Sequence, residues 1–271
     1  MRTEKISSAQ NPKIKMLLAL EEKSRVRREK ALFVVEGRKE IRHCLEAGYH
    51  AKDLFVCREI ISDRELDEIT RLCGDGCTIY EVPEFIYGKI AYRAGTEGVI
   101  AEVEIMEKSL GDVKLRKDPL VVVLESVEKP GNLGAVLRTA DAADADAVII
   151  CDPLTDLFNP NLIRASLGAI FTRQVVTATS GETLKWLNDN GIRIYTAQLQ
   201  DSCWYYDTDM KHASALVMGT EHEGLSTFWR MHADAHVKIP MLGQMDSLNV
   251  SVSSAILMFE AVRQRHSGTK E

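Results

Sequence analysis

The stretch LVVVLESVEKPGNLGAVLRTAD, residues 120–141, gives the clearest structural signal in the chain. Its first five residues, 120–124, are uninterruptedly apolar, which is typical of a strand covered on both faces of a parallel sheet. A Pro-Gly turn follows, and a helical pattern runs over 133–143 with Asn132 at a natural N-cap position. The stretch predicts a strand–loop–helix unit, the repeat from which parallel sheets are built.

The same alternation continues to the end of the chain. Further strands are predicted at 147–151, 174–177, 192–197, 216–219 and 236–239, and further helices at 162–169, 182–190 and 250–265. The last helix carries an apolar stripe that predicts a core-facing side. The stripe consists of Val252, Ala255, Ile256, Phe259 and Val262. The fold class is therefore α/β with a mainly parallel sheet.

The first third of the chain predicts a smaller α/β unit. Its expected strands are 32–37, 54–56, 78–82 and 98–103, and its expected helices are 12–20, 39–47 and 63–72. A polar stretch at 107–118 separates it from the second half. We expect a first domain at 1–106, a linker at 107–118 and a second domain at 119–271.

Charge is unevenly distributed along the chain. The 271 residues are 45% hydrophobic and 27% charged, which excludes collagen-like, disordered and disulfide-scaffold proteins. The net charge of −6 divides into +6 for residues 1–42 and −12 for the remainder. Such asymmetry is the form that a basic arm on an acidic body takes, although a solvated basic helix gives the same pattern. If the arm binds nucleic acid, its candidate contacts are Lys23, Arg25, Arg27, Arg28 and Lys30.

Cysteine usage and hydropathy favour a cytoplasmic protein. The six cysteines form no C-x-x-C pair and no cluster with histidine, so we expect neither a zinc site nor disulfides. The first ten residues, MRTEKISSAQ, lack the apolar centre of a signal peptide. The longest aliphatic runs are too short to span a bilayer.

In open parallel sheets, ligands bind outside the carboxyl ends of the strands. Asn132 and Arg138 follow the strand that ends at 124, where a helix N-terminus and a guanidinium could hold an anion together. Equally, Asn132 could only cap the helix while Arg138 pairs with Asp141 or Glu125. The glycines here match neither a dinucleotide fingerprint nor a phosphate-binding P-loop.

Two further loops collect unusual residues. Gly219-Thr-Glu221-His-Glu223 follows the strand 216–219, where the carboxylates could serve acid–base chemistry, bind a ribose hydroxyl or simply face solvent. Ser247 and Asn249 precede the last helix within a run of serines larger than capping needs. A fourth segment places Arg164 inside a helix after an Asn-Pro turn, as a second phosphate contact or a surface residue.

Three ordered motifs resemble those of the SpoU/TrmH branch of the SPOUT RNA methyltransferases. They are N-x-G-x-x-x-R-T-A-D from Asn132, G-x-E-x-x-G-L-S from Gly219, and I-P-M-x-G-x-x-x-S-L-N-V-S-V from Ile239. The resemblance covers residues 120–265. The first third more loosely resembles the small substrate-binding domain, related to RNA-binding ribosomal proteins, that precedes the catalytic domain in many members. The sequence departs from the family pattern at Lys129, Asp144 and Ser253.

The resemblance implies a methyltransferase that uses S-adenosyl-L-methionine (AdoMet) and acts on a ribose 2′-oxygen of RNA. It also implies a deep trefoil knot near the C-terminus and a homodimer, with no metal and no membrane. The implied catalytic residues are Asn132, Arg138, Glu221, Ser247 and Asn249. The expected cofactor-binding residues are Gly219, Ile239 and Leu248, with Thr196 and Ala197 at the end of the strand 192–197.

Ribosomal RNA is the expected substrate, because a separate domain precedes the catalytic one. The first alternative is the same methyl transfer on transfer RNA. The second is a non-catalytic RNA-binding module, suggested by the basic N-terminal segment. A nucleotide-dependent dehydrogenase lacks its glycine fingerprint and ranks last.

Overall fold

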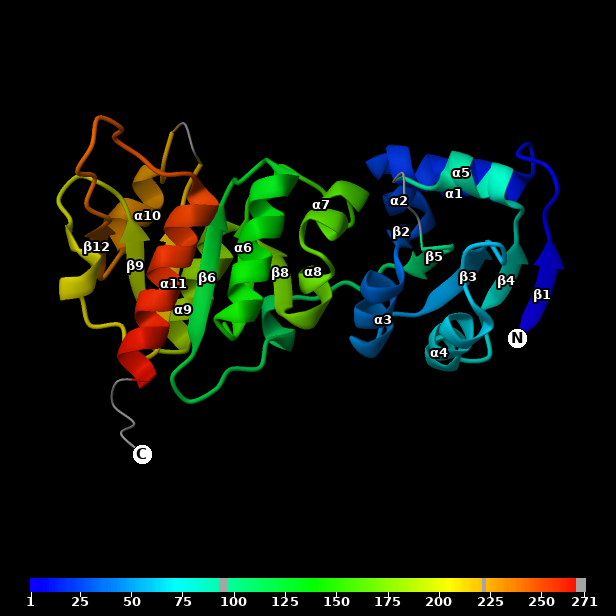
Figure 1. Cartoon of the computed structure of the whole chain (residues 1–271). Helices are drawn as coiled ribbons and strands as arrows, with labels where there is room; N and C mark the ends of the chain where they lie inside the picture. The colour runs from blue at the N-terminus through cyan, green and yellow to red at the C-terminus, as the bar shows by residue number, and fades with distance from the viewer. Residues whose placement is uncertain (93–96, 221–222, 267–271) are drawn as a thin grey trace. The chain divides into compact units, whose positions relative to one another are not determined.

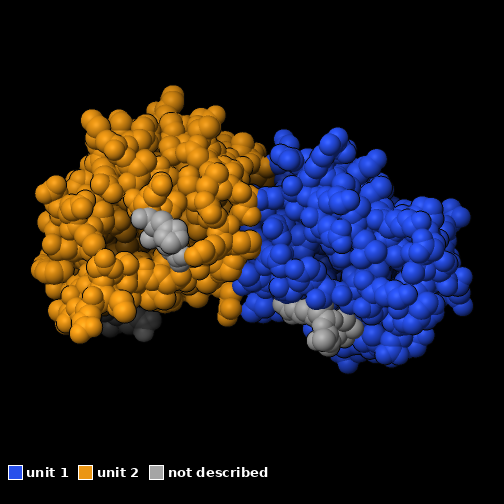
Figure 2. Space-filling model, turned by 90° about the horizontal axis from the view of Figure 1, so that it is seen from above, with its two compact units in different colours: residues 1–107, 156–172 blue, residues 108–155, 173–271 orange. Residues whose placement is uncertain are grey.

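The structure is a computed structural model that describes residues 1–92, 97–220 and 223–266. By its internal contacts the chain divides into two compact units (Figures 1 and 2). Unit 1 comprises Met1–Glu107 and Asp156–Thr172, and unit 2 comprises Lys108–Thr155 and Arg173–Glu271. The expected domain ranges leave 156–172 in the second domain, whereas its contacts group it with unit 1.

Unit 1 is built on a five-stranded sheet with the strand order β1-β4-β3-β5-β2. The strands are β1 (Arg2–Lys5), β2 (Leu32–Glu36), β3 (Ala51–Val56), β4 (Thr78–Glu81) and β5 (Val99–Glu104). β1, β4 and β3 run parallel, whereas β5 is antiparallel to β2 and β3. The four strands expected in the first third are present. β1 is not predicted, because a polar RTEK edge strand carries no apolar alternation.

The helices of unit 1 are α1 (Pro12–Glu22), α2 (Ser24–Lys30), α3 (Arg38–Glu46), α4 (Asp63–Cys73), α5 (Glu84–Ile90), α7 (Pro160–Ala165) and α8 (Ala169–Thr172). α1 and α5 share one apolar cluster with the sheet, in which Leu17, Phe55 and Ile86 are buried. α4 begins with a capping box between Ser62 and Glu65, which fixes where that helix starts.

The segment 156–172 joins unit 1 through aromatic packing. Phe158 and Phe171 lie 4.5 and 6.1 Å from the ring of Phe33, measured between centroids. The single helix expected at 162–169 is instead two short helices, because Leu167 and Gly168 both have positive φ. A Cβ at Gly168 would lie 3.0 Å from Nδ1 of His43, so this turn also needs glycine for close approach to α3.

Unit 2 contains a seven-stranded sheet whose described strand pairs are all parallel, in the order β10-β12-β9-β11-β6-β7-β8. Its strands are β6 (Leu120–Glu125), β7 (Ala147–Cys151), β8 (Gln174–Ala178), β9 (Arg193–Ala197), β10 (Cys203–Trp204), β11 (Ser214–Met218) and β12 (Ala235–Lys238). Every residue of β6, β7 and β11 is buried, as continuous apolar runs predict. The α/β class with a mainly parallel sheet is confirmed.

The helices of unit 2 are α6 (Pro130–Ala142), α9 (Ser180–Asp189), α10 (Thr227–His232) and α11 (Val250–His266). Leu187 of α9 and Trp229 of α10 share an apolar cluster with Val121 and Val123 of β6. α6 and α11 pack on each other. In the described part of the chain, none of the helices has the length and apolar character needed to cross a membrane.

The orientation of α11 differs from the sequence-based expectation. Val252 and Phe259, from the stripe predicted to face the core, are 46% and 47% exposed. Leu257, Met258 and Ala261 are buried instead. Because α11 is apolar on more than one side, its periodicity fits two orientations, and packing against α6 selects one of them.

Candidate cofactor and catalytic site

A cavity of about 420 Å³ opens at the carboxyl ends of three neighbouring strands of unit 2. β9 ends at Ala197, β11 at Met218 and β12 at Lys238, and all three residues line it. Its size is within the range of pockets that hold small ligands, about 300–1,000 Å³. Its position is the one expected for a ligand of an open parallel sheet.

Five residues singled out from the sequence line this cavity. They are Ala197, Gly219, Ile239, Ser247 and Leu248. They come from three separate loops, which the parallel strands bring together at one edge of the sheet. Thr196 is not among the lining residues, because it is fully buried and its hydroxyl lies 2.6 Å from Nδ1 of His236.

Gly219 is required by its own loop. A Cβ there would lie 2.1 Å from the carbonyl oxygen of Gly224 and 2.5 Å from the backbone nitrogen of Leu225. Thr220 and Gly224 exchange backbone hydrogen bonds of 3.1 Å, which closes the loop tightly on itself. The sequence suggests that Gly219 admits a ligand to the backbone. The structure adds that its missing side chain admits the returning chain.

Two side chains of the cavity carry buried polar atoms that have no hydrogen-bond partner among the described residues. These are Oε1 of Gln198 and Nε of Arg230. The amide nitrogen of Gln198 donates to the carbonyl of Gln200 at 2.9 Å, so only its acceptor is left over. Unpaired buried polar groups are costly, and these two indicate that the cavity takes a polar ligand.

Sequence reasoning missed Arg230. The signal was available, because Arg230 lies about one turn into the helix that follows the Gly219 loop. Arg138 is singled out in the sequence for the same kind of position, because the helix predicted from 133 places it about one turn in after the strand that ends at 124. That Nε of Arg230 is buried and has no partner among the described residues becomes visible only in the folded chain.

The first and third motifs meet directly. Nδ2 of Asn249 donates to Oδ1 of Asn132 across 3.2 Å, although 117 positions separate the two residues. Asn132 is not the N-cap of α6, because the helix begins at Pro130 with Lys129 in the cap position. Proline is favoured at the first helical position, so Pro130 moves the start by one turn.

Arg138 is exposed on α6 and, within the part of the chain that the structure describes, its guanidinium makes no hydrogen bond or ion pair. The carboxylates considered as its partners have other contacts. Oε2 of Glu125 accepts from the backbone nitrogen of Ser226 at 2.8 Å, and Oδ1 of Asp141 accepts from Nε of Arg173 at 3.0 Å. Glu221, expected from the second motif, lies outside the described residues.

The polar run before α11 is largely used for capping. Oδ1 of Asn249 accepts from the backbone nitrogen of Ser251 at 2.9 Å and from its hydroxyl at 2.6 Å. The hydroxyl of Ser254 donates to the carbonyl of Val250. Ser247 remains exposed, and its hydroxyl donates to Asp246, which also lines the cavity.

The basic N-terminal segment is partly structural. Arg27 is only 3% exposed, and its guanidinium donates to Asp156 at 2.7 Å and to the carbonyl of Leu20 at 2.6 Å. It therefore does not present its charge to a ligand, contrary to the expectation for this residue. The remaining candidates, Lys23, Arg25, Arg28 and Lys30, are exposed.

Arg164 lies in unit 1 and contacts an exposed aromatic ring. Its guanidinium carbon stands 4.4 Å from the ring centroid of Tyr92, and its Nη2 donates to Oδ1 of Asn161 at 3.1 Å. The hydroxyl of Tyr92 donates to the same oxygen at 2.8 Å. A stacked guanidinium and an exposed ring are both surfaces on which bases of RNA can lie.

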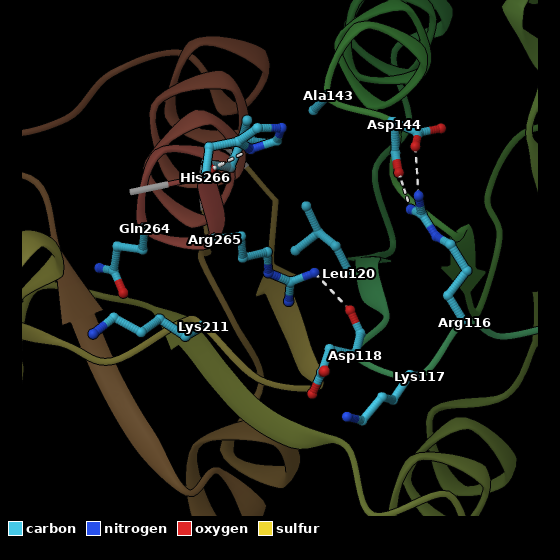
Figure 3. A pocket seen from close by; sticks show the side chains of 11 residues that line it. Arg116, Lys117, Asp118, Leu120, Ala143, Asp144, Lys211, Gln264, Arg265 and His266 are labelled. Carbon is cyan, nitrogen blue, oxygen red and sulfur yellow. Dashed lines mark hydrogen bonds and ion pairs between the residues drawn. The ribbon is translucent and has the colours of Figure 1, made fainter. Parts of the chain in front are cut away.

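A second cavity of unit 2, about 450 Å³, lies at the opposite edge of the sheet (Figure 3). Arg116 donates there to Asp144 at 2.5 Å and to Asp146 at 2.9 Å. Arg265 donates to four backbone carbonyls, at Met210, Asp118, Pro119 and His212. The two arginines that line this cavity are therefore already hydrogen-bonded to groups of the protein.

The contacts of Asp144 at this edge of the sheet account for the departure from the family pattern at that position. Asp144 has a φ of +50°, a conformation that glycine adopts more easily. Its carboxylate accepts from both Arg116 and Arg173, and these hydrogen bonds hold the pKa of Asp144 below its usual range. Two ion pairs thus accompany the less favourable backbone conformation.

Comparisons with known proteins agree along the chain. The SpoU rRNA Methylase family matches residues 119–259, and the MRM3-like substrate binding domain matches residues 11–101. A Staphylococcus epidermidis protein named for the TrmH family of tRNA/rRNA methyltransferases is 32% identical, with 86% of this chain and 96% of that protein covered.

Two further proteins bear on the cofactor and the substrate class. A Streptomyces viridochromogenes 23S rRNA (uridine(2479)-2′-O)-methyltransferase is 34% identical over 63% of this chain and 61% of its own. The AdoMet-bound rRNA methyltransferase of Sinorhizobium meliloti has a TM-score of 0.88 and 29% identity, covering 96% of this chain and 98% of its own. The chain belongs to the SpoU family of RNA methyltransferases, whose cofactor is AdoMet.

Proposed function

We propose that this protein transfers a methyl group from AdoMet to a ribose 2′-oxygen of ribosomal RNA. The observation that carries the proposal is the cavity at the carboxyl edge of the unit 2 sheet, with the Asn132–Asn249 pair joining two of the three motifs. Two relatives support ribosomal RNA over transfer RNA. The 23S enzyme of S. viridochromogenes is named for 2′-O methylation, and the S. meliloti rRNA enzyme matches both units.

The lining of the cavity fits AdoMet. Leu199, Met218 and Leu257 supply apolar surface, while Gln198 and Arg230 hold polar atoms that lack partners among the described residues. AdoMet is itself divided in this way, with an adenine ring at one end and a charged amino acid at the other. When bound, it supplies a methyl group that its sulfonium makes electrophilic.

The residues of the first and third motifs act on the RNA side of the reaction in this proposal. Arg138 does not line the cavity, and a guanidinium stays protonated in proteins, so we assign it to hold the phosphate beside the target ribose. Asn132 and Asn249 orient the hydroxyl that is to be methylated. Ser247, on the cavity lining, and Glu221 keep the roles that the resemblance implies.

Methyl transfer requires the accepting oxygen to approach in line with the bond that breaks. Holding two reactants in such a geometry is itself a large part of catalysis. No covalent participation by the protein is needed. The proposal therefore requires that removing Arg138 impair transfer without impairing cofactor binding.

RNA contacts are proposed at two places in unit 1. Lys23, Arg25, Arg28 and Lys30 form the basic patch, from which Arg27 is excluded by its burial. Arg164 with Tyr92 forms the second. Replacing Lys23, Arg28 and Lys30 together by alanine should reduce the slope of log affinity against log salt by about 2–3. Lys185→Ala, at a lysine exposed on α9, is the control, and an equal effect of both variants would contradict the patch.

A homodimer is proposed through the exposed side of α11. Val252 and Phe259 present apolar surface there, and exposed apolar patches commonly mark association sites. Phe259→Glu should shift the protein toward monomer in analytical ultracentrifugation, whereas Phe85→Glu, at a more exposed phenylalanine of unit 1, should not. The trefoil knot and the cytoplasmic location stay predictions.

In the deciding experiment, the protein is incubated with methyl-labelled AdoMet and with RNA from a strain that lacks this protein. Ribosomal RNA should acquire label at a ribose 2′-oxygen, which protects the adjacent phosphodiester bond from alkaline cleavage. Transfer RNA, tested in parallel, should remain unlabelled. Arg138→Met should lower the transfer rate about 100-fold and leave AdoMet affinity unchanged.

Failure would take distinct forms. Label found only in transfer RNA would mean that the substrate is transfer RNA and not ribosomal RNA. AdoMet binding with no transfer to either RNA would contradict the enzymatic proposal, and RNA binding without AdoMet binding would favour the non-catalytic module.

A further inference from the structure

We propose that Arg230 binds the carboxylate of the methionine end of AdoMet. This inference rests on the proposed function, which puts the cofactor into the cavity at the carboxyl ends of β9, β11 and β12. It concerns a side chain outside the three motifs and assigns a direction to the cofactor within the cavity.

The first observation is that Arg230 is firmly held at the cavity. Its neighbour Trp229 is fully buried, and the indole nitrogen of Trp229 donates to the hydroxyl of Ser180 at 3.1 Å. Ser226, which precedes α10, is fixed by the buried carboxylate of Glu125 at 2.8 Å. α10 is therefore anchored at its start and its middle, so the guanidinium does not depend on a mobile support.

The second observation is that Nε of the half-buried Arg230 is itself buried and lacks a partner among the described residues. Nη2 of the same guanidinium lies 3.8 Å from the position of a Cβ on Gly224. The side chain thus lies beside Gly224 on the lining of the cavity. A buried N–H donor without a partner is unfavourable until an acceptor reaches it.

The third step concerns which part of AdoMet can serve. AdoMet has a single anionic group, the carboxylate, whereas its ammonium and sulfonium are cationic. A guanidinium presents planar, paired donors whose geometry matches a carboxylate. The acidic side chains on the lining, Glu223 and Asp246, are exposed and complement the cationic ammonium.

The other cation on the cavity lining is a weaker candidate. Nζ of Lys238 stands 4.6 Å from the ring centroid of Trp204, which is itself exposed. Its charge is therefore already stabilised by an aromatic face outside the cavity. Lys238 provides a control cation at the same cavity.

The test compares two ligands by isothermal titration calorimetry. S-adenosylhomocysteine retains the amino acid end of the cofactor without a methyl group to transfer. 5′-Methylthioadenosine retains the adenosine and the sulfur but has no carboxylate. Arg230→Met should weaken S-adenosylhomocysteine about 10–100-fold and leave methylthioadenosine within about twofold. Arg230→Lys should recover part of the loss, and Lys238→Met should change neither ligand more than about threefold.

Each other outcome overturns the inference. Equal losses for both ligands in Arg230→Met would mean that Arg230 only supports the cavity. Unchanged S-adenosylhomocysteine binding with weakened RNA binding would assign Arg230 to an RNA phosphate. Should the wild-type protein bind neither ligand, the proposed function would fail as well, and that failure is visible before any variant is made.

Discussion

Two cavities of similar volume lie at opposite edges of one sheet in unit 2, and they differ in how their polar groups are satisfied. At the carboxyl edge, Oε1 of Gln198 and Nε of Arg230 are buried without partners among the described residues. The second cavity lies at the amino ends of the strands, which we call the amino edge. There, Arg116 is paired with two aspartates and Arg265 with four backbone carbonyls (Figure 3).

The contrast shows that volume and charge alone do not identify a site. The amino-edge cavity has more basic side chains, yet its arginines are used to hold its own walls together. Arg265 fastens the end of α11 to the segments that precede β6 and β11. We therefore interpret the amino-edge cavity as a structural contact that holds α11 to the sheet, which we call the clasp. We interpret the carboxyl-edge cavity as the ligand site.

The largest effect is expected from closing the carboxyl edge. In Gly219→Ala the new Cβ would lie 2.1 Å from a backbone oxygen, so the 219–225 loop has to move. Displacements of about 1 Å at a site can cost about 100-fold in rate, and we expect methyl transfer to fall at least that far, together with S-adenosylhomocysteine affinity. Gly243→Ala is the control, since its Cβ would meet no atom within 4 Å. Normal cofactor binding by Gly219→Ala would refute the tight-loop interpretation.

Breaking the amino edge should instead cost stability. Arg116→Met removes a partner of Asp146, whose side chain is 2% exposed. Losing one partner of a buried pair can cost 3–5 kcal/mol, but the Arg116 side chain is 56% exposed, so we expect about 2 kcal/mol. All three tryptophans, at 186, 204 and 229, lie in unit 2, so tryptophan fluorescence during urea unfolding reports on this unit.

Cofactor affinity should be unchanged in Arg116→Met. Lys185→Met, which removes an exposed ion pair with Asp189, should alter the free energy of unfolding by less than about 0.5 kcal/mol. A variant of Arg116 that unfolds like the wild-type protein but binds S-adenosylhomocysteine poorly would reverse the roles assigned to the two edges.

Parts of this contrast were predictable from the sequence. The strand and helix patterns predict six of the seven strands of unit 2, several of them as continuous apolar runs, and the rule for parallel strands brings Ala197, Gly219 and Ile239 to one edge. These predictions depend on local pattern and on a general property of sheets, which is why they succeed.

The remainder depends on contacts between distant residues. Arg27 belongs to a charged run, but its partner Asp156 is 129 positions away, so its burial has no local signature. Met258 and Phe259 are adjacent in α11, and only packing decides that the first is buried and the second exposed. Arg230 likewise becomes informative only once folding brings it beside Gly224 on the lining of the cavity.

A smaller effect concerns acid stability at the amino edge. Burial disfavours the ionised form of Asp146, but hydrogen bonds from Arg116 and from the backbone of Leu120 outweigh it and lower its pKa. Arg173 and Arg116 lower the pKa of Asp144 in the same way. A carboxylate with a lowered pKa stabilises the fold above its unfolded-state value, about 3.9 for Asp, and that contribution is lost as the pH falls further.

The wild-type protein should therefore lose more stability than Arg116→Met between pH 6 and pH 3. Because the Asp144 side chain is 66% exposed and screened by solvent, we expect the difference to be about 1 kcal/mol. Urea unfolding followed by tryptophan fluorescence at the two pH values measures it. If the free energies of unfolding of the two proteins differed by the same amount at pH 6 and pH 3, Arg116 would not set the ionisation of Asp144 and Asp146.

The smallest effect is expected from the two exposed lysines of the amino edge. Lys117 and Lys211 line that cavity, and their removal leaves the hydrogen bonds of Arg116 and Arg265 intact. The double variant Lys117→Met/Lys211→Met should change the free energy of unfolding by less than about 0.5 kcal/mol, as surface substitutions usually do. Its RNA affinity, S-adenosylhomocysteine affinity and transfer rate should stay within about twofold of the wild type. A large loss in any of these three would mean that an anion binds at the amino edge, and the clasp would then have to be regarded as a second site, because the hydrogen bonds of Arg116 and Arg265 would have stayed intact.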